Sequence, residues 1–298
     1  MINKYKRKYI LPLKGTSFYE QLDDCFRQII EIKDHENTIL QITLFIKANN
    51  NREYLDRKNT ILDKQRIIFK NQIPATSVVS QIPDEKEVSV EIVYMTSKEE
   101  KTHFIQYKEI DKVIYTVVES DVEKEIFGAG ITLNDYIDKK KSVQADTAFK
   151  IMKDILENES MTFADVIRQW NYVEDIVGYD SLCESKIQNY QILNELRAKY
   201  YSEASFINGY PAATGIGMKA GGIILEFYAC HTHDKEKIIP VKNPKQKDAY
   251  EYSQEVLIGV PLNTNKPKSA PKFERAKYIA VKNNRLIFIS GDRKSVVR

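Results

Sequence analysis

Tyr210-Pro-Ala-Ala-Thr-Gly-Ile-Gly-Met218 is the stretch that decides the fold of this chain. Its glycines resemble a dinucleotide-binding fingerprint, but that motif needs a strand before the glycines and a helix that opens at them. Here the run that follows, residues 223–230, is apolar and typical of a strand. The sequence therefore disfavours nucleotide binding and favours a strand turn whose backbone lies close to a ligand.

Composition indicates an ordinary globular protein. The 298 residues can bury a full core, and the length suggests about two domains. The 45 basic and 42 acidic residues are mixed along the chain, so charge gives no case for binding nucleic acid or a membrane, and the cluster Lys4-Tyr-Lys-Arg-Lys8 is interpreted as a solvated strand edge. The three cysteines have no CxxC spacing, and no run is long and apolar enough to span a bilayer. We therefore expect a cytoplasmic protein.

One pattern of elements occurs twice along the chain. The first copy is predicted to contain helices at 19–32 and 54–69 and strands at 38–47, 74–79 and 88–94. The second copy has the same order, with strand-like runs within 107–120, helices at 145–157 and 187–201, and strands at 161–172, 210–218 and 223–230. Pro74-Ala-Thr-Ser and Pro211-Ala-Ala-Thr begin equivalent strands, which supports an internal repeat.

A third copy begins near the C-terminus. Residues 273–291 form two apolar runs around the turn Lys282-Asn-Asn-Arg285, which predicts a hairpin, and the stretch 243–270 has the prolines and lysines of a linker. We therefore expect an N-terminal domain at 1–106, a central domain at 107–240, and a linker with the first hairpin of an incomplete unit at 241–298.

Three segments in this order resemble the chorismatase family: Gln169-Trp-Asn-Tyr172, the stretch 210–218 and Phe273-Glu-Arg-Ala276. The resemblance covers residues 140–291 by motif, and the N-terminal part agrees by pattern only. It implies an α+β fold of tandem RidA/YjgF-like units, each a mixed sheet covered by helices, with the last unit incomplete. It also implies that chorismate is cleaved to pyruvate plus 3-hydroxybenzoate, 4-hydroxybenzoate or a dihydroxycyclohexadiene carboxylate, without a metal or an organic cofactor.

The same resemblance implies a substrate-binding group, Tyr252, Arg275, Tyr250, Thr214 and Gly215. Chorismate is a dicarboxylate, and an arginine offers a carboxylate two parallel hydrogen bonds. The alternative is structural: the two tyrosines pack on a sheet and Arg275 pairs locally. Asn194 and Arg197 lie on a predicted helix face, and we expect them to be structural.

The resemblance also implies a catalytic glutamate on a strand well beyond Ser290-Gly291, where the family pattern stops. Residues 292–297, Asp-Arg-Lys-Ser-Val-Val, are charged, and a common sequencing adapter, GATCGGAAGAGCGTCGTG, translates to them. The hypothesis is that the chain as given is truncated, lacks its general acid, and is inactive or nearly so.

Two other functions compete with this interpretation. An imine deaminase of the RidA type needs an arginine after the proline, where this chain has Ala212 and Ala213. A small-metabolite binding module without catalysis fits an incomplete last unit. A metal site at His231-Thr-His-Asp234 is disfavoured because no further ligands have a suitable spacing. The sequence leaves the choice between a monomer and a homo-oligomer open.

Overall fold

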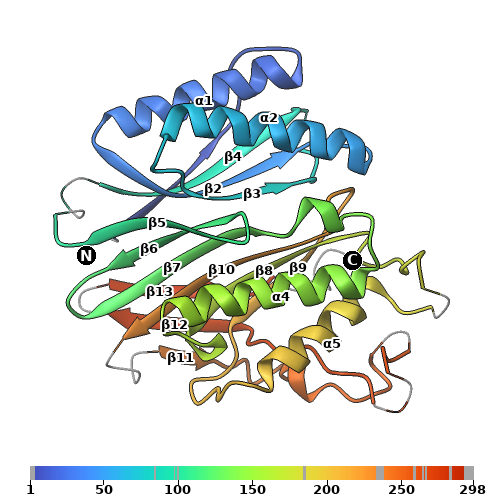
Figure 1. Cartoon of the computed structure of the whole chain (residues 1–298). Coiled ribbons are helices and arrows are strands. Elements are labelled where there is room, and N and C mark those ends of the chain that lie inside the picture. Colours follow the sequence, from blue (N-terminus) through green and yellow to red (C-terminus); the bar gives the residue numbers. More distant parts are fainter. Residues whose placement is uncertain are drawn as a thin grey trace.

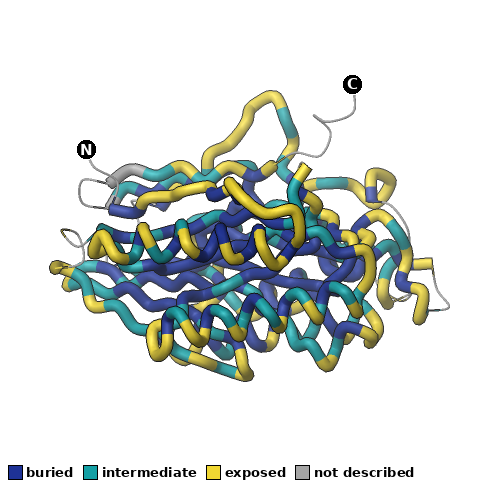
Figure 2. Tube along the Cα trace, turned by 90° about the horizontal axis from the view of Figure 1, so that it is seen from above, coloured by how far each residue is buried: buried dark blue, intermediate teal, exposed yellow. Residues whose placement is uncertain are grey.

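The computed structural model describes residues 4–83, 85–96, 98, 101–183, 186–232, 238–257, 260–263, 265, 267–281 and 284–291. Three sheets form the interior, and the helices cover the outer faces of the two larger sheets (Figure 1). In Figure 2 the strands are mostly buried, whereas the outward sides of the helices are exposed. The predicted α+β fold with mixed, helix-covered sheets is confirmed.

The first sheet has the strand order β1-β4-β2-β3, and only β2 and β3 run parallel. Its elements are β1 (Tyr5–Ile10), α1 (Phe18–Asp34), β2 (Asn37–Ile46), α2 (Asn51–Phe69), β3 (Ala75–Val79) and β4 (Val88–Thr96). The two helices begin where the sequence provides capping side chains. Ser17 and Glu20 form a capping box at α1, and the Asn50 side chain accepts from Glu53 N–H at α2.

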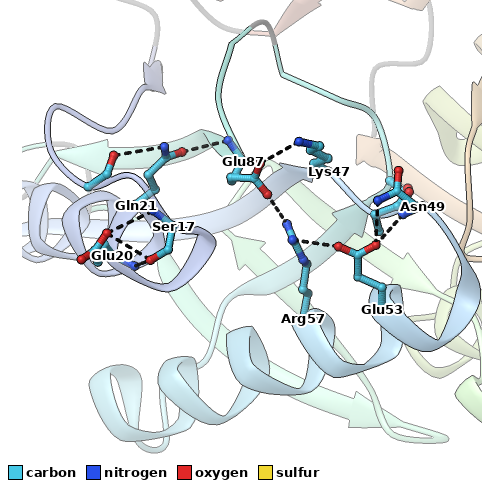
Figure 3. A network of polar contacts seen from close by, with 11 residues as sticks. Ser17, Glu20, Gln21, Lys47, Asn49, Glu53, Arg57 and Glu87 are labelled. Atoms are coloured by element: carbon cyan, nitrogen blue, oxygen red, sulfur yellow. Dashed lines mark hydrogen bonds and ion pairs between the residues drawn. The ribbon is translucent and has the colours of Figure 1, made fainter.

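A polar network joins the two helices to the loop before β4 (Figure 3). The Glu87 carboxylate accepts from Lys47 Nζ at 2.9 Å and from Arg57 Nη1 at 2.8 Å, while Glu87 N–H donates to Gln21 Oε1 at 2.8 Å. Arg57 also pairs with Glu53 at 2.8 Å. Through its carboxylate and its backbone N–H, Glu87 thus links α1, α2 and the strand that follows them.

The second sheet has the strand order β5-β6-β7-β10-β8-β9. Its strands are β5 (Phe104–Ile110), β6 (Val113–Glu119), β7 (Glu123–Ile131), β8 (Val166–Glu174), β9 (Ala212–Met218) and β10 (Ile223–Thr232), and its helices are α4 (Lys141–Asn158) and α5 (Asn189–Tyr201). Short 3-10 turns occur at Asn134–Tyr136, Phe163–Asp165 and Ala249–Glu251. The strand predicted at 161–172 starts late because Thr162 caps the 3-10 turn before it.

The repeat predicted from the sequence is present in the topology. The order β1-β4-β2-β3 in the first sheet corresponds to β7-β10-β8-β9 in the second, and β2–β3 and β8–β9 are the parallel pairs. The hairpin β5–β6 extends the second sheet. The third sheet, β11 (Ile238–Val241), β12 (Ala276–Val281) and β13 (Asn284–Ile289), is antiparallel and contains the hairpin predicted at 273–291. Lys282 and Asn283 of its turn, and residues 292–298, lie outside the described residues.

The units meet at a shared interior. One apolar cluster contains side chains from all three sheets, including Leu40 and Val93, Phe127 and Tyr228, and Ile279. Strand β5 crosses residue 106, and β11 crosses residue 240 to pair with β12. The limits 1–106, 107–240 and 241–298 therefore remain a proposal about which parts fold as units.

The expectation of a solvated basic edge is wrong for Lys4. Lys6 and Lys8 are exposed on β1, but Lys4 is only 6% exposed and forms ion pairs with Glu123 and Glu125 of β7. Burial alone would lower the pKa of Lys4, but the two carboxylates outweigh burial and raise it. The edge strand is thus anchored at its start by a buried ion pair with the second sheet.

Candidate functional site

The three sequence segments that resemble chorismatases lie side by side in the structure. Strand β9 runs parallel to β8, with Thr214 opposite Trp170 and Gly215 opposite Asn171. On its other side, Ala212 forms a parallel bridge with Glu274, whose N–H donates to the Pro211 carbonyl at 3.0 Å. Residues 210–218 therefore form the junction between the second and third sheets.

Arg275 and Tyr252 are in direct contact at this junction. Arg275 Nη2 donates to the Tyr252 hydroxyl, and the guanidinium lies 5.4 Å from the centre of the Phe273 ring. Tyr252 and Phe273 pack with Ala213 and Ala249 in a small apolar cluster. The structure thus brings together two of the predicted binding residues, half-buried, beside the strand that contains the glycine-rich stretch.

Arg197 of helix α5 also lies near the ring of Phe273. Its guanidinium lies 5.8 Å from the Phe273 ring centre, and Nη2 donates to Asn194 Oδ1 at 2.5 Å. The side chain is 1% exposed, and its Nε has no hydrogen-bond partner among the described residues. Burying a guanidinium costs free energy when its hydrogen-bond acceptor is an uncharged amide and not a carboxylate. This burial marks Arg197 as a candidate for binding an anion. The sequence predicted that Asn194 and Arg197 share a helix face and serve a structural role, whereas the near-complete burial of the guanidinium is seen only in the structure.

Buried amides form a polar layer beneath α5. Tyr201 donates to Gln169 Oε1 at 2.5 Å, and Gln169 Nε2 donates to Asn171 Oδ1 at 2.6 Å. Burial raises the pKa of Tyr201, so it stays a neutral donor at physiological pH. The Gln-Trp-Asn-Tyr segment therefore contributes a hydrogen-bonded support under the helix that carries Arg197.

Thr214 and Gly215 have different roles from Arg275. The Thr214 hydroxyl accepts from Arg168 Nη2 at 2.7 Å and from Gly291 N–H at 2.9 Å. Successive strand residues point to opposite faces, so the Thr214 side chain lies on the face opposite Ala213 and its cluster with Tyr252. At Gly215, an added Cβ would lie 2.7 Å from the Tyr190 ring, so glycine lets α5 pack closely there.

Tyr250 belongs to a charged network next to this group. Its hydroxyl donates to Asp248 Oδ2 at 2.8 Å and accepts from Lys242, which also pairs with Asp248 at 2.6 Å and Glu274 at 3.0 Å. Burial alone would lower the pKa of Lys242, but these three acceptors outweigh burial and raise it. Tyr250 is thus a structural partner of a lysine here, with its ring 5.3 Å from that of Tyr210.

The described part of the chain has neither a cluster of metal ligands nor a helix suited to a membrane. Within it, no three His, Cys, Asp or Glu side chains are grouped so that they could hold a metal ion. His231 Nδ1 contacts Asp165 Oδ1 at 3.0 Å, and His233 and Asp234 lie outside the described residues. No described helix combines the length and apolarity that crossing a bilayer requires. All three cysteines are free thiols.

Comparison with known proteins identifies relatives over the central part of the chain. Residues 94–229 match the family model described as chorismatase FkbO/Hyg5-like, N-terminal. A 3-hydroxybenzoate synthase of Streptomyces hygroscopicus is 29% identical over 133 residues, which are 44% of this chain and 34% of that protein. The matched region thus spans about a third of that relative.

A solved chorismatase structure shares the fold. A chorismatase crystal structure aligns with 97% of this chain and 69% of its own, at a TM-score of 0.55 and 15% identity. A YjgF/YER057c/UK114 family member of Mycobacterium tuberculosis aligns over 38% of this chain and 82% of its own, at a TM-score of 0.28 and 19% identity. Residues 94–229 are thus similar to the N-terminal part of chorismatases of the FkbO/Hyg5-like kind.

Proposed function

We propose that the group around Phe273 binds chorismate, in an enzyme that removes the enolpyruvyl group of this substrate as pyruvate. One observation carries the proposal: Arg275 and Arg197 approach the same aromatic ring, at 5.4 and 5.8 Å. Chorismate carries two carboxylates, one on its ring and one on its enolpyruvyl arm. Two guanidinium groups beside one apolar surface fit such a molecule in charge and in shape.

Tyr252 would position the substrate through Arg275. Because the Tyr252 hydroxyl accepts from Arg275, it fixes one edge of the guanidinium. Ala213 contributes a small apolar side chain where an imine deaminase of the RidA type would have its arginine. The proposal therefore favours a ring-bearing substrate over a small imino acid.

The proposed reaction is cleavage of an enol ether. A proton adds to the methylene carbon, and positive charge develops on the ether carbon. In hydrolysis the bond between that carbon and the ether oxygen then breaks, so pyruvate forms and the ring keeps the oxygen as a hydroxyl. When water attacks that carbon, the other product is a dihydroxycyclohexadiene carboxylate. Without net addition of water, the ring aromatises to a hydroxybenzoate. The choice among these products, including 3- against 4-hydroxybenzoate, belongs to the proposal and to its test.

The carboxylates beside this group are held by a lysine. Glu274 and Asp248 both accept from Lys242, and Glu274 Oε1 also accepts from Tyr210 N–H. Burial alone would raise the pKa of Asp248, but hydrogen bonds from Lys242 and Tyr250 outweigh burial and lower it. Asp248 is thus kept ionised, and an ionised carboxylate is a poor general acid. We therefore expect this 298-residue chain to bind chorismate with little turnover.

Calorimetry with chorismate tests the binding, and an assay coupled to lactate dehydrogenase tests pyruvate release. Arg275→Gln is expected to weaken chorismate binding by about 10-fold or more, because a hydrogen bond to a charged group is lost. Arg66→Gln is the matched control, since Arg66 is exposed on α2 and, within the described part of the chain, pairs only with nearby Asp63.

Equal affinity in wild type and Arg275→Gln would remove the site from the proposal. Fast pyruvate release by this chain would instead show that a general acid is present, and would overturn the expectation of little turnover. Chorismate binding with no pyruvate release would favour the binding-module alternative for this chain.

A further inference from the structure

A cavity of about 300 Å³ lies where the three sheets meet. Aromatic rings from four strands form one wall. Tyr5 and Phe127 have ring centres 5.2 Å apart, Phe127 and Tyr228 5.2 Å, and Tyr228 and Phe288 5.3 Å. These rings come from β1, β7, β10 and β13, so the wall is continuous across the molecule. Trp170 of β8 lines the cavity as well.

The tyrosines of this wall are fixed by one buried carboxylate. Tyr5 and Tyr228 both donate to Glu125, and Lys4 pairs with the same group. Burial and the Glu125 charge raise the pKa of both tyrosines, which keeps their hydroxyls protonated donors. The aromatic surface of the cavity is therefore preorganised before any ligand enters.

A buried arginine that no carboxylate pairs with lines the same cavity. Arg168 is 6% exposed, and among the described residues its guanidinium forms no ion pair and its Nη1 has no hydrogen-bond partner. Nη2 donates to Thr214, and the guanidinium lies 4.6 Å from the Trp170 ring centre. Burial lowers the pKa of Arg168 to about 10, so it is still cationic at neutral pH. Arg7, the other guanidinium of the lining, is paired with Glu91 at 2.5 Å.

We propose that this cavity binds a small aromatic carboxylate, whose ring packs against Phe127, Tyr228 and Phe288 and whose carboxylate lies beside Arg168. The volume is at the lower end of ligand pockets, which suits a molecule with one ring. An anion would offset the buried charge of Arg168, and the aromatic wall offers a ligand ring a surface to pack against.

The cavity is separate from the group around Phe273. Arg168 contacts the Thr214 side chain, whereas Tyr252 packs with Ala213, and these neighbours point to opposite faces of β9. The two sites are connected through that strand, because Thr214 also accepts from Gly291 at the end of the third sheet. A ligand that moves Arg168 would therefore act on the same strand as the proposed substrate.

The chain contains one tryptophan, and it lines the cavity, so its fluorescence reports on binding there. We expect benzoate to change the emission of Trp170 in a saturable manner, and benzamide, its uncharged match in shape, to bind at least about 10-fold more weakly. The same response to both compounds, or no saturable change with benzoate at millimolar concentrations, would overturn the proposal. This comparison uses the unmodified chain and needs no variant to fold.

Variants then assign the site. Arg168→Gln should lose the benzoate response, and Arg168→Lys, which keeps the charge, should retain part of it, provided circular dichroism shows that both fold. Arg275→Gln should respond like wild type. If Arg275→Gln loses the response while Arg168→Gln keeps it, benzoate binds beside Phe273 and the cavity proposal fails. That result would leave the proposed chorismate site standing, and a failure of chorismate binding would likewise leave the cavity untouched.

Discussion

Ser77 and Thr214 occupy equivalent places in the two copies of the repeat, and each hydroxyl accepts from the N–H of a glycine in the following unit. Gly130 N–H donates to Ser77 at 2.8 Å, and Gly291 N–H donates to Thr214 at 2.9 Å. Ser77 lies on β3 and Thr214 on β9. Each of these strands is paired in parallel with its neighbour and follows a proline directly. The same hydroxyl-to-glycine contact thus joins the first unit to the second and the second to the third.

Loss of the Thr214 hydroxyl should destabilise the junction between the second and third sheets. Thr214→Val keeps the shape but leaves Gly291 N–H and Arg168 Nη2 without this acceptor, at a cost of about 1–3 kcal/mol. Thr214→Ser keeps the hydroxyl and should stay within about 1 kcal/mol of wild type. Urea unfolding of the two variants measures the difference, and equal midpoints would contradict the role given to the hydroxyl.

Glu226 should make the stability of the protein depend on pH. It is 4% exposed and accepts from Thr43 at 3.2 Å across the first junction, and burial raises its pKa to about 7. Because its pKa is higher folded than unfolded, the folded chain binds an extra proton between about pH 4.5 and 7. Stability from this group is fully present at the low end of that window and is lost as pH rises through 7. The loss is at most about 3 kcal/mol.

Glu226→Gln isolates this contribution. The amide keeps the shape and stays neutral, so the variant should be more stable than wild type at pH 8 and similar to it at pH 5. Thermal unfolding at the two pH values provides the measurement. A constant difference between variant and wild type across this range would rule out the titration of Glu226 as the cause.

Lys4 should be the important lysine of the N-terminal strand. Lys4→Met leaves Glu123 and Glu125 buried without their cation, and breaking a buried ion pair costs about 3–5 kcal/mol. Lys8→Met on the same strand removes an exposed charge and should change stability by less than about 0.5 kcal/mol. Similar unfolding midpoints for the two variants would show that Lys4 is solvated after all.

Gly215→Ala should disturb the packing of α5 on the sheet. The new methyl group would lie 2.7 Å from the Tyr190 ring, and overpacking of this kind costs about 1–3 kcal/mol. Tyr190→Leu makes room, so the double variant should lose less stability than the sum of the two single changes. Additive losses in a double-mutant cycle would mean that the two residues are not in contact.

Much of the fold could be predicted because apolar spacing directly encodes helices and strands. The helices at α1, α2, α4 and α5 and the hairpin β12–β13 lie where periodicity placed them. Strand β7 was not predicted from the sequence. Its segment Phe127-Gly-Ala-Gly130 corresponds to Phe288-Ile-Ser-Gly291, since each ends in the glycine that donates to the hydroxyl at its junction. Glycines at alternate positions hide the strand pattern there.

The candidate site was less predictable because burial of a charged side chain leaves no local signal. Arg168 and Arg197 look like ordinary surface residues in a chain with 45 basic side chains, and only tertiary packing buries them. The contact between Tyr252 and Arg275 came from family resemblance, not from spacing. The direction of Thr214 could have been inferred from strand alternation, since it is the immediate neighbour of Ala213.

The two junctions differ in the charge beside the shared hydroxyl. Glu226 and Thr43 lie near Ser77 at the first junction, whereas Arg168 contacts Thr214 at the second. Repeated domains risk pairing with the wrong copy while they fold. One junction has an acidic group and the other a basic group. If the two copies of the repeat exchanged places, each buried charge would lie beside neighbours that do not match it. We therefore expect a swapped arrangement of the two units to be disfavoured.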